Sequence, residues 1–197
     1  MAETVSFTRM IDGTREDYEL LEREEQPFFD ALPDRILTVF EMLGEATGGY
    51  KVSRMEHCLQ TATRAERDGA DEEIVVAALL HDVGDVVSPH NHADVAAAIL
   101  RPYVREEVHW IVRHHYAFQL YNYGHYYGKD RNLRDRYRSS PWFQSCERFC
   151  DGWDQASFDP AYRSYPLAHF EPMVRRIFLR KPFDPAVMKA SGRIEDY

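Results

Sequence analysis

The polar and apolar residues of the chain follow a helical period over most of its length. Apolar side chains recur three and four positions apart in separate stretches, which places them on one face of a helix. We find no internal repeat and no convincing strand pattern. The pattern predicts helices over residues 16–25, 33–43, 53–68, 72–82, 88–101, 104–118, 140–154 and 166–179. The expected fold is therefore an all-α helical bundle.

One of these helices is apolar on every side. Residues 74–80 form an uninterrupted apolar run that leads directly into His81 and Asp82, and Asp71 is placed to cap the start of the helix. A helix that is apolar all round is a buried helix, so this histidine and this aspartate are delivered into the interior. A carboxylate there is costly unless it is neutralised, paired or bound to a metal. The pattern therefore points to a metal site.

Local signals mark the boundaries of several other segments. Residues 53–56 read Ser-Arg-Met-Glu, which matches a capping box, and the helix that they start should end at Asp68-Gly69. Residues 44–49 are expected to form a loop. A loop rich in tyrosine and glycine over 121–128 should lead into a charged segment over 130–138. Residues 1–14 are interpreted as an N-terminal arm and residues 180–197 as a C-terminal tail.

Length and charge narrow the classes of protein that fit. The 197 residues are enough for one domain with a sizeable core, and we expect a single domain over 1–197. The net charge of −9 does not favour a nucleic-acid partner, although a few local arginines could still hold a small anion. No apolar run is long enough for a membrane span, and residues 1–13 show no signal-peptide pattern. We therefore expect a cytoplasmic protein, a monomer or homodimer, in which Cys58, Cys146 and Cys150 are reduced core thiols.

Helical periodicity selects which candidate ligands face inward. In the helix over 104–118, His115 shares the apolar stripe with Val108, whereas His114 falls on the face of Glu107. In the helix over 140–154, Asp154 shares the stripe, whereas Asp151 falls among polar residues.

Two further histidines complete the candidate set. His92 lies one turn before an apolar face, whereas His90 precedes its helix. His57 is supported only by its distance of 24 positions from His81, because it lies roughly opposite the apolar stripe of its own helix. Four histidines and two aspartates suit iron, manganese or zinc, and six ligands fit two metals bridged by an aspartate.

The order of these residues along the chain resembles the HD-domain superfamily. The series consists of His57, His81-Asp82, His92, His115 and Asp154, and its extra histidines match the dinuclear branch. Within that branch the chain resembles the mixed-valent diiron oxygenases that cleave the carbon–phosphorus bond of 1-hydroxyphosphonates. The likeness extends over residues 5–10, 49–52, 91–97, 153–160 and 169–176.

The resemblance implies a fold, a cofactor and a reaction. It implies an HD-domain helical bundle with a dinuclear site at its centre, holding two iron ions in a mixed Fe(II)/Fe(III) state. Asp82 would bridge the irons; His57, His81 and Asp154 would hold one iron, and His92 and His115 the other. The substrate would be a 1-hydroxy-2-aminoethylphosphonate, in the first place (R)-1-hydroxy-2-(trimethylammonio)ethylphosphonate, cleaved with O2 as co-substrate to glycine betaine and phosphate.

The chain also departs from the patterns of its suspected relatives. Relatives that open their site with a Tyr/Glu pair would have a glutamate near Tyr50, and residues 48–51 contain none. Asp85 stands where the inositol-oxygenase branch has a lysine, and the glycine-rich signature of cyclic-dinucleotide hydrolases is missing. Two other readings stay open: an HD phosphohydrolase acting on a nucleotide or phosphomonoester, in which the metals activate water, and a helical module whose His/Asp cluster is structural.

The substrate would need groups for its phosphonate and for its ammonium. Arginine suits a phosphonate, and aromatic faces or a carboxylate suit a quaternary ammonium. Besides Asp82 and Tyr50 at the reacting centre, the residues expected to contact substrate are Asp85, Gln119, Tyr121, His125 and Arg148. Lys129, Arg113, Arg131, Arg134, Arg175 and Arg176 are further cationic candidates. The tyrosine-rich loop could equally well pack on the bundle or on a partner subunit.

Overall fold

The structure is a computed structural model that describes residues 3–45 and 47–188. Its α-helices are α1 (Arg15–Asp30), α2 (Leu32–Glu41), α3 (Arg54–Arg67), α4 (Glu72–Leu80), α5 (His92–Leu100), α6 (Glu106–Tyr123), α7 (Phe143–Gly152), α8 (Leu167–Phe178) and α9 (Pro185–Met188). Short 3₁₀ helices occupy Met10–Asp12, Met42–Gly44, Val83–Val86, Pro89–Asn91, Gly124–Tyr127, Leu133–Tyr137 and Asp154–Ala156. The described residues contain no strand, which confirms the prediction of an all-α fold.

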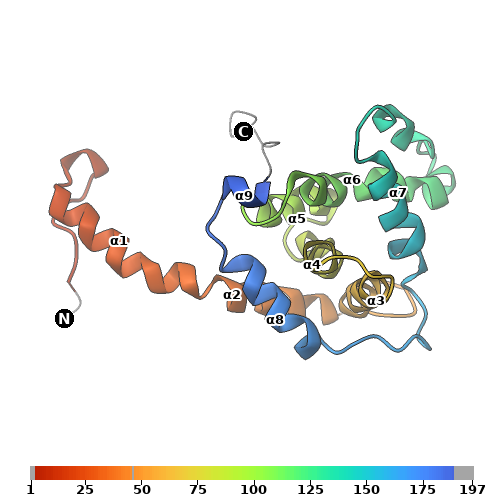
Figure 1. Ribbon diagram of the computed structural model, residues 1–197, viewed down its shortest axis with the longest axis horizontal. Helices are drawn as coiled ribbons and strands as arrows, with labels where there is room; N and C mark the ends of the chain where they lie inside the picture. The colour runs from red at the N-terminus through yellow and green to blue at the C-terminus, as the bar shows by residue number, and fades with distance from the viewer. Residues whose placement is uncertain (1–2, 46, 189–197) are drawn as a thin grey trace.

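Helix α4 lies at the centre of the bundle, where α3, α6 and α8 pack around it (Figure 1). Every residue from Ile74 to Leu80 is buried, as the uninterrupted apolar run predicts. The Asp71 side chain caps the helix by accepting hydrogen bonds from the backbone N–H groups of Glu73 (3.0 Å) and Ile74 (3.2 Å). The chain therefore leaves α4 at His81 already inside the protein.

Helix α3 begins at the expected cap, but its capping box is only half formed. The Ser53 hydroxyl accepts the backbone N–H of Glu56 at 3.1 Å. The Glu56 carboxylate does not return to the Ser53 backbone; it accepts from Gln60 (3.2 Å) and from the Ser164 hydroxyl (2.8 Å). This side chain therefore ties α3 to the segment that precedes α8 rather than closing its own cap.

Several helix boundaries differ from the prediction. Helix α1 continues beyond Glu25 to Asp30 and contains Pro27. Helix α6 continues beyond Phe118 to Tyr123, because Gln119 and Leu120 are also buried and extend the buried face by another turn. Part of the predicted tyrosine-rich loop is therefore helical. Helix α7 ends at Gly152, so Asp154 lies in the 3₁₀ turn that follows it.

The predicted N-terminal arm folds back on α1, which extends away from the bundle (Figure 1). The Asp17 carboxylate accepts hydrogen bonds from the backbone N–H of Ser6 (2.7 Å), the Ser6 hydroxyl (2.9 Å) and the backbone N–H of Thr14 (2.9 Å). The backbone hydrogen bond from Ser6, followed by that from Thr14, lowers the pKa of Asp17 to about 2. These contacts hold the arm in place at the far end of α1.

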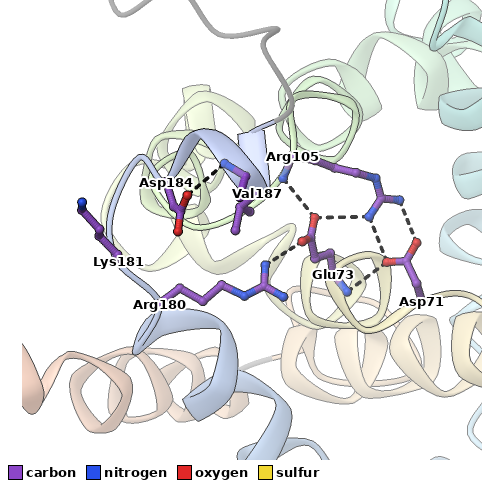
Figure 2. A pocket seen from close by; sticks show the side chains of 8 residues that line it. Asp71, Glu73, Arg105, Arg180, Lys181, Asp184 and Val187 are labelled. Carbon is purple, nitrogen blue, oxygen red and sulfur yellow. Dashed lines mark hydrogen bonds and ion pairs between the residues drawn. The ribbon is translucent and has the colours of Figure 1, made fainter.

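Ion pairs anchor the start of α4 to the C-terminal part of the chain (Figure 2). Arg105, which lies at the N-cap position of α6, contacts Asp71 at 2.8 Å and Glu73 at 3.2 Å, and Arg180 contacts Glu73 at 2.6 Å. The segment over 180–188, part of the predicted tail, thereby packs against the N-terminal end of α4; residues 189–197 lie outside the described part of the chain. No helix within the described residues has the length and apolar character needed to cross a membrane.

The turn after α4 approaches the start of α5 so closely that only glycine fits at position 84. A Cβ atom there would lie 2.2 Å from the backbone oxygen of His92. We expect Gly84→Ala to lower the free energy of unfolding by about 1–3 kcal/mol, because the backbone of α5 must shift to relieve the overlap. Chemical denaturation followed by circular dichroism measures this loss.

Gly152→Ala is the matched control for this substitution. A Cβ at Gly152 meets no atom within 4 Å among the described residues, so this variant should be no less stable than the parent. Equal stability of the two alanine variants would contradict the close approach at Gly84.

Candidate metal centre

Six imidazole and carboxylate side chains from separate elements meet at the C-terminal end of α4. His57 comes from α3, His92 from the first turn of α5 and His115 from the middle of α6. His81 and Asp82 follow α4, and Asp154 lies just beyond α7. The structure thus brings together all the residues that the sequence nominates as metal ligands.

The first cluster consists of His57, His81 and Asp154, all of them buried. The Nε2 atoms of the two histidines lie 3.2 Å apart. Asp154 Oδ1 lies 3.2 Å from His57 Nε2 and 3.7 Å from His81 Nε2. Three ligand atoms therefore converge on one point from three different elements.

The second cluster consists of His92, His115 and Asp82. The Nε2 atoms of His92 and His115 lie 3.3 Å apart, and each lies 3.4 Å from Asp82 Oδ1. The spacing matches that of the first cluster, so a second ion could be held by the same kinds of donor atom.

Asp82 belongs to both clusters through its two oxygen atoms. Oδ1 faces His92 and His115, whereas Oδ2 lies 3.7 Å from His57 Nε2 and 3.6 Å from His81 Nε2. One carboxylate thus offers one oxygen to each group of imidazoles. This is the arrangement of a carboxylate that bridges two metal ions.

Backbone carbonyl groups fix the tautomer of all four histidines. The Nδ1 atoms of His57, His81, His92 and His115 lie at hydrogen-bond distance from the carbonyl oxygens of Ser157 (3.0 Å), Ala78 (2.8 Å), Pro89 (3.2 Å) and Val112 (2.6 Å), respectively. Because a carbonyl oxygen can only accept, each Nδ1 must carry the proton. In the neutral rings the Nε2 lone pairs then face one another, which is unfavourable unless a cation lies between them. Nδ1–H donation of this kind is the usual support of metal-bound histidine.

The charges of the site favour a cation as well. Burial alone would raise the pKa of Asp82 and of Asp154, but the neighbouring histidines, led by His81, lower both pKa values well below the usual range. Burial alone would lower the pKa of His81, but Asp82 and Asp154 raise it well above its usual value. In addition, Asp154 Oδ2 is buried without a hydrogen-bond partner among the described residues. A metal ion at this point would supply the missing partner, so the donor set fits one.

The structure also places the rejected alternatives away from the clusters. His114 stacks on Trp110, with ring centroids 4.2 Å apart, and its Nδ1 bonds to the Trp110 carbonyl oxygen at 2.8 Å. Asp151 is exposed and lies 3.8 Å from Arg134, and His90 is exposed in a 3₁₀ turn. Periodicity within α6 therefore agrees with the inward position of His115, whereas Asp154 reaches the first cluster from the 3₁₀ turn beyond the end of α7.

His57 shows where periodicity gives too little information. It is buried because α3 buries polar as well as apolar side chains, including those of Gln60, Thr61 and Thr63. Gln60 and Thr63 bond to backbone atoms of the segment that leads to α8, at Asp159 and Tyr165. A pattern that counts only apolar residues cannot detect this second buried face.

The three cysteines are free and buried, as expected for core thiols. Cys150 Sγ contacts the backbone oxygen of His115 at 3.6 Å. Cys58 Sγ lies within 4.8 Å of a ligand atom of His81 and of one of Asp82. Burial raises the pKa of the Cys58 and Cys150 thiols. They are therefore protonated side chains that pack behind the ligand helices.

A cavity of about 630 Å³ opens onto both clusters. Five of the candidate ligands and Asp85 line it. Residues near α3 and the 3₁₀ turn after α7 form one group of lining residues: Tyr50, Val52, Ser53, Arg54, Gln155 and Phe158. Residues of α6 and the segment after it form the other: Tyr116, Gln119, Asn122, Tyr123, Tyr127 and Lys129. Tyr50 stacks on Phe158, with ring centroids 5.0 Å apart, and Phe158 stacks on His57 at 4.4 Å. The entrance is therefore largely aromatic and the floor is formed by imidazoles and carboxylates.

The residues expected to contact substrate divide into two groups. Tyr50, Asp85 and Gln119 line the cavity. His125, Arg148 and Tyr121 do not: the His125 ring packs against Tyr126 at 4.0 Å, Arg148 lies over Trp153 at 5.6 Å, and Tyr121 lies under Arg134 at 3.9 Å. Because α6 continues as a helix past Phe118, it turns Gln119, Asn122 and Tyr123 toward the cavity and carries Tyr121 away from it.

The cavity also contains residues that sequence reasoning did not single out. Arg54, Asn122 and Phe158 are the main ones. A signal for Asn122 exists in retrospect, because positions 119 and 122 follow His115 at helical spacing. Arg54 has no such signal, since its partner lies 31 positions away: its Nε donates to Asp85 Oδ2 at 2.7 Å. Asp85 Oδ1 also lies 3.4 Å from His92 Nδ1, so the charge of Asp85 already has partners.

We expect the wild-type protein to bind two metal ions and the His92→Ala variant to retain one. The reason is that His92 contributes to the second cluster alone, whereas the first keeps its three ligands. Metal analysis of purified protein measures the number of metal ions per chain. His90→Ala is the matched control, because His90 is exposed in the 3₁₀ turn before α5 and belongs to neither cluster, so this variant should keep both ions. Loss of metal from both variants, or from neither, would contradict the division into clusters.

Metal affinity should fall as the pH is lowered. The raised pKa of His81 favours its protonated form in the metal-free protein, and an incoming ion must displace that proton. Each displaced proton weakens binding by about tenfold per pH unit below that pKa. Metal titrations between about pH 6 and pH 8 should show this slope.

Stability of the metal-free protein should respond in the opposite direction. A raised folded pKa stabilises the fold below the unfolded pKa of His, about 6.5, and this stabilisation is lost as the pH rises through the folded value. The unfolding temperature of protein treated with a chelator should therefore fall as the pH is raised. A pH-independent metal affinity would show that the imidazoles are not the ligands.

Sequence comparisons agree with this geometry. Residues 54–139 match the family model of the HD domain, and this segment contains all the candidate ligands except Asp154. A curated relative from Leisingera caerulea, [1-hydroxy-2-(trimethylamino)ethyl]phosphonate dioxygenase (glycine-betaine-forming), is 36% identical over 84 residues. That match covers 37% of this chain and 43% of the relative, so the chain spans less than half of the relative's length. The all-helical fold and the order of the histidines and aspartates agree with the match of residues 54–139 to the HD domain.

Proposed function

We propose that the protein is a diiron oxygenase that cleaves the carbon–phosphorus bond of a 1-hydroxy-2-aminoethylphosphonate. The first candidate substrate is (R)-1-hydroxy-2-(trimethylammonio)ethylphosphonate, and the products would be glycine betaine and phosphate. The atoms balance when both oxygen atoms of one O2 enter the products. The observation that carries the proposal is the position of Asp82, whose two oxygens face two separate groups of imidazoles.

The ligand chemistry supports iron at both positions. Four imidazoles and two carboxylates form the kind of mixed nitrogen and oxygen set that binds iron, whereas calcium and magnesium prefer oxygen donors. Two bound iron ions would supply O2 activation and Lewis-acid binding of substrate oxygens. The protein would contribute fixed ligand positions, because each imidazole is oriented by a backbone carbonyl group.

The aromatic side chains of the cavity are suited to a quaternary ammonium group. Tyr50 and Phe158 form one stacked pair, and Tyr116, Tyr123 and Tyr127 line the same cavity. A trimethylammonium group cannot donate hydrogen bonds, so it is recognised by contact with ring faces. Asp85 is a weaker candidate for this role than the sequence suggested, since it is paired with Arg54.

Positive charge for the phosphonate is available from two residues of the cavity. Arg54 uses its Nε to bond Asp85, which leaves the rest of its guanidinium for an anion. Lys129 donates to the Tyr116 hydroxyl at 2.5 Å and also lines the cavity. Both can offset the negative charge that a phosphonate brings near Asp82 and Asp154.

Tyr50 would cover the entrance without a glutamate partner. It is 56% exposed and stacks on Phe158, which in turn stacks on His57. Its ring can therefore shield the floor of the cavity from water when a substrate is bound, and it can move away at little cost because one side faces solvent. Gly48 and Gly49, both at positive φ, shape the backbone just before it.

An assay of phosphate release with and without O2 tests the proposal. Iron-loaded protein should release phosphate from the hydroxylated trimethylammonium phosphonate in air, with consumption of O2 and formation of glycine betaine, and should release none anaerobically. His92→Ala should lose this activity by at least about a hundredfold, because it removes a ligand of the second ion. Arg148→Gln, outside the cavity, should remain close to wild type.

The outcome also separates the competing function. Phosphate release from nucleotides or phosphomonoesters under anaerobic conditions, supported by manganese, would identify a phosphohydrolase and overturn the oxygenase proposal.

A further inference from the structure

One polar side chain of the cavity has a hydrogen-bond donor without a partner. Gln119 is only 9% exposed, lines the cavity and lies one helical turn after His115 on α6. Its Nε2 is buried and has no hydrogen-bond acceptor among the described residues. A buried amide donor left unpaired is costly, and such groups in native proteins usually await a water or a ligand. The open volume beside this side chain is the cavity.

A neighbouring residue determines which end of the Gln119 amide is free. Asn122 Nδ2 donates to Gln119 Oε1 at 3.0 Å. With Oε1 used in this way, Nε2 is the end left for the cavity. The reverse orientation would place the negative end of the amide dipole in a cavity that already contains Asp82, Asp85 and Asp154. Electrostatics therefore favours the orientation in which Asn122 donates and Nε2 remains available.

We propose that Asn122 is a positioning residue that holds the Gln119 amide with its N–H donor toward the cavity, so that Gln119 binds an anionic oxygen of the substrate. This inference rests on the proposed function for the identity of the anion, a phosphonate. A phosphonate has three oxygen atoms, and those that do not reach a metal ion need donors. Gln119 supplies a neutral donor that recognises the anion without adding a charge.

The Gln119–Asn122 pair would let the site select between ligands with and without an anionic group. A donor in this position favours oxygen acceptors of an anion and gives no advantage to a ligand that has only the cationic end of the substrate. Lys129 and Arg54 provide long-range attraction, whereas the buried amide requires an acceptor at one place. Specificity for the phosphonate is thus separated from recognition of the ammonium group.

The decisive variant is Asn122→Asp. A carboxylate can only accept, so the Gln119 amide must rotate to donate Nε2 to it and present Oε1 to the cavity. Binding of the trimethylammonium phosphonate substrate to iron-loaded protein, measured anaerobically by calorimetry so that no turnover occurs, should weaken by about tenfold to a hundredfold. Binding of choline, which has the same cationic group and no phosphonate, should not weaken.

Two controls separate rotation of the amide from the added charge. Gln155→Glu places a new carboxylate at another position of the cavity and leaves Gln119 untouched. Its effect on phosphonate binding should be several-fold smaller than that of Asn122→Asp. In a Gln119→Met background, which removes the amide and keeps the length of the side chain, Asn122→Asp should have only the small effect of Gln155→Glu.

Steady-state kinetics provide a second readout. Loss of an anion contact that is present throughout the reaction should raise KM and leave kcat within a few-fold of the parent. If Asn122→Asp weakens substrate and choline equally, or has the same effect in the Gln119→Met background, Asn122 does not position the amide and the inference is overturned. Unchanged phosphonate binding in Asn122→Asp would show that the amide already presents Oε1.

The experiment distinguishes failure of this inference from failure of the proposed function. Anaerobic binding of inorganic phosphate can be compared across the same variants even if the protein does not consume O2. A phosphohydrolase would still show the effect of Asn122→Asp on phosphate binding. Conversely, an active oxygenase whose phosphonate affinity ignores both Gln119 and Asn122 would retain its function and refute this inference alone.

Discussion

The structure depends on placing two carboxylates, Asp82 and Asp154, among four imidazoles inside a helical bundle. Burial of these charges is unfavourable, and the neighbouring histidines offset that cost. The Nε2 atoms of the histidines, however, meet in pairs at 3.2 Å and 3.3 Å. Cations at two points would resolve this arrangement of charges and lone pairs. The shared position of Asp82 links these points, because its two oxygens face the two groups of imidazoles.

The rest of the bundle keeps these six side chains in place. The apolar α4 carries His81 and Asp82 inward, and Arg105 and Arg180 anchor its other end through Asp71 and Glu73. Gly84 lets the turn after α4 approach the backbone of His92, a residue of the second cluster. Carbonyl groups then orient each ring. The candidate metal site thus depends on the backbone as well as on its ligands, because a backbone carbonyl group orients each imidazole.

The cavity divides recognition among different kinds of contact. Stacked aromatic rings at Tyr50 and Phe158 suit a cationic group, Arg54 and Lys129 supply positive charge, and Gln119 offers a buried donor oriented by Asn122. The pairing of Arg54 with Asp85 removes a free carboxylate from the cavity. This distribution would suit the zwitterionic substrate proposed above.

The sequence by itself determined the helical fold, the burial of α4 and the choice of His115 over His114. These conclusions depend on periodicity within one helix, which is a local property and can be read from the chain. Only the tertiary structure decided that His57 is buried, because α3 hides polar residues against a segment about a hundred positions away. It also decided that Gln119 and Arg54 line the cavity while Tyr121, His125 and Arg148 do not, since those positions depend on how far α6 continues and on contacts between distant residues.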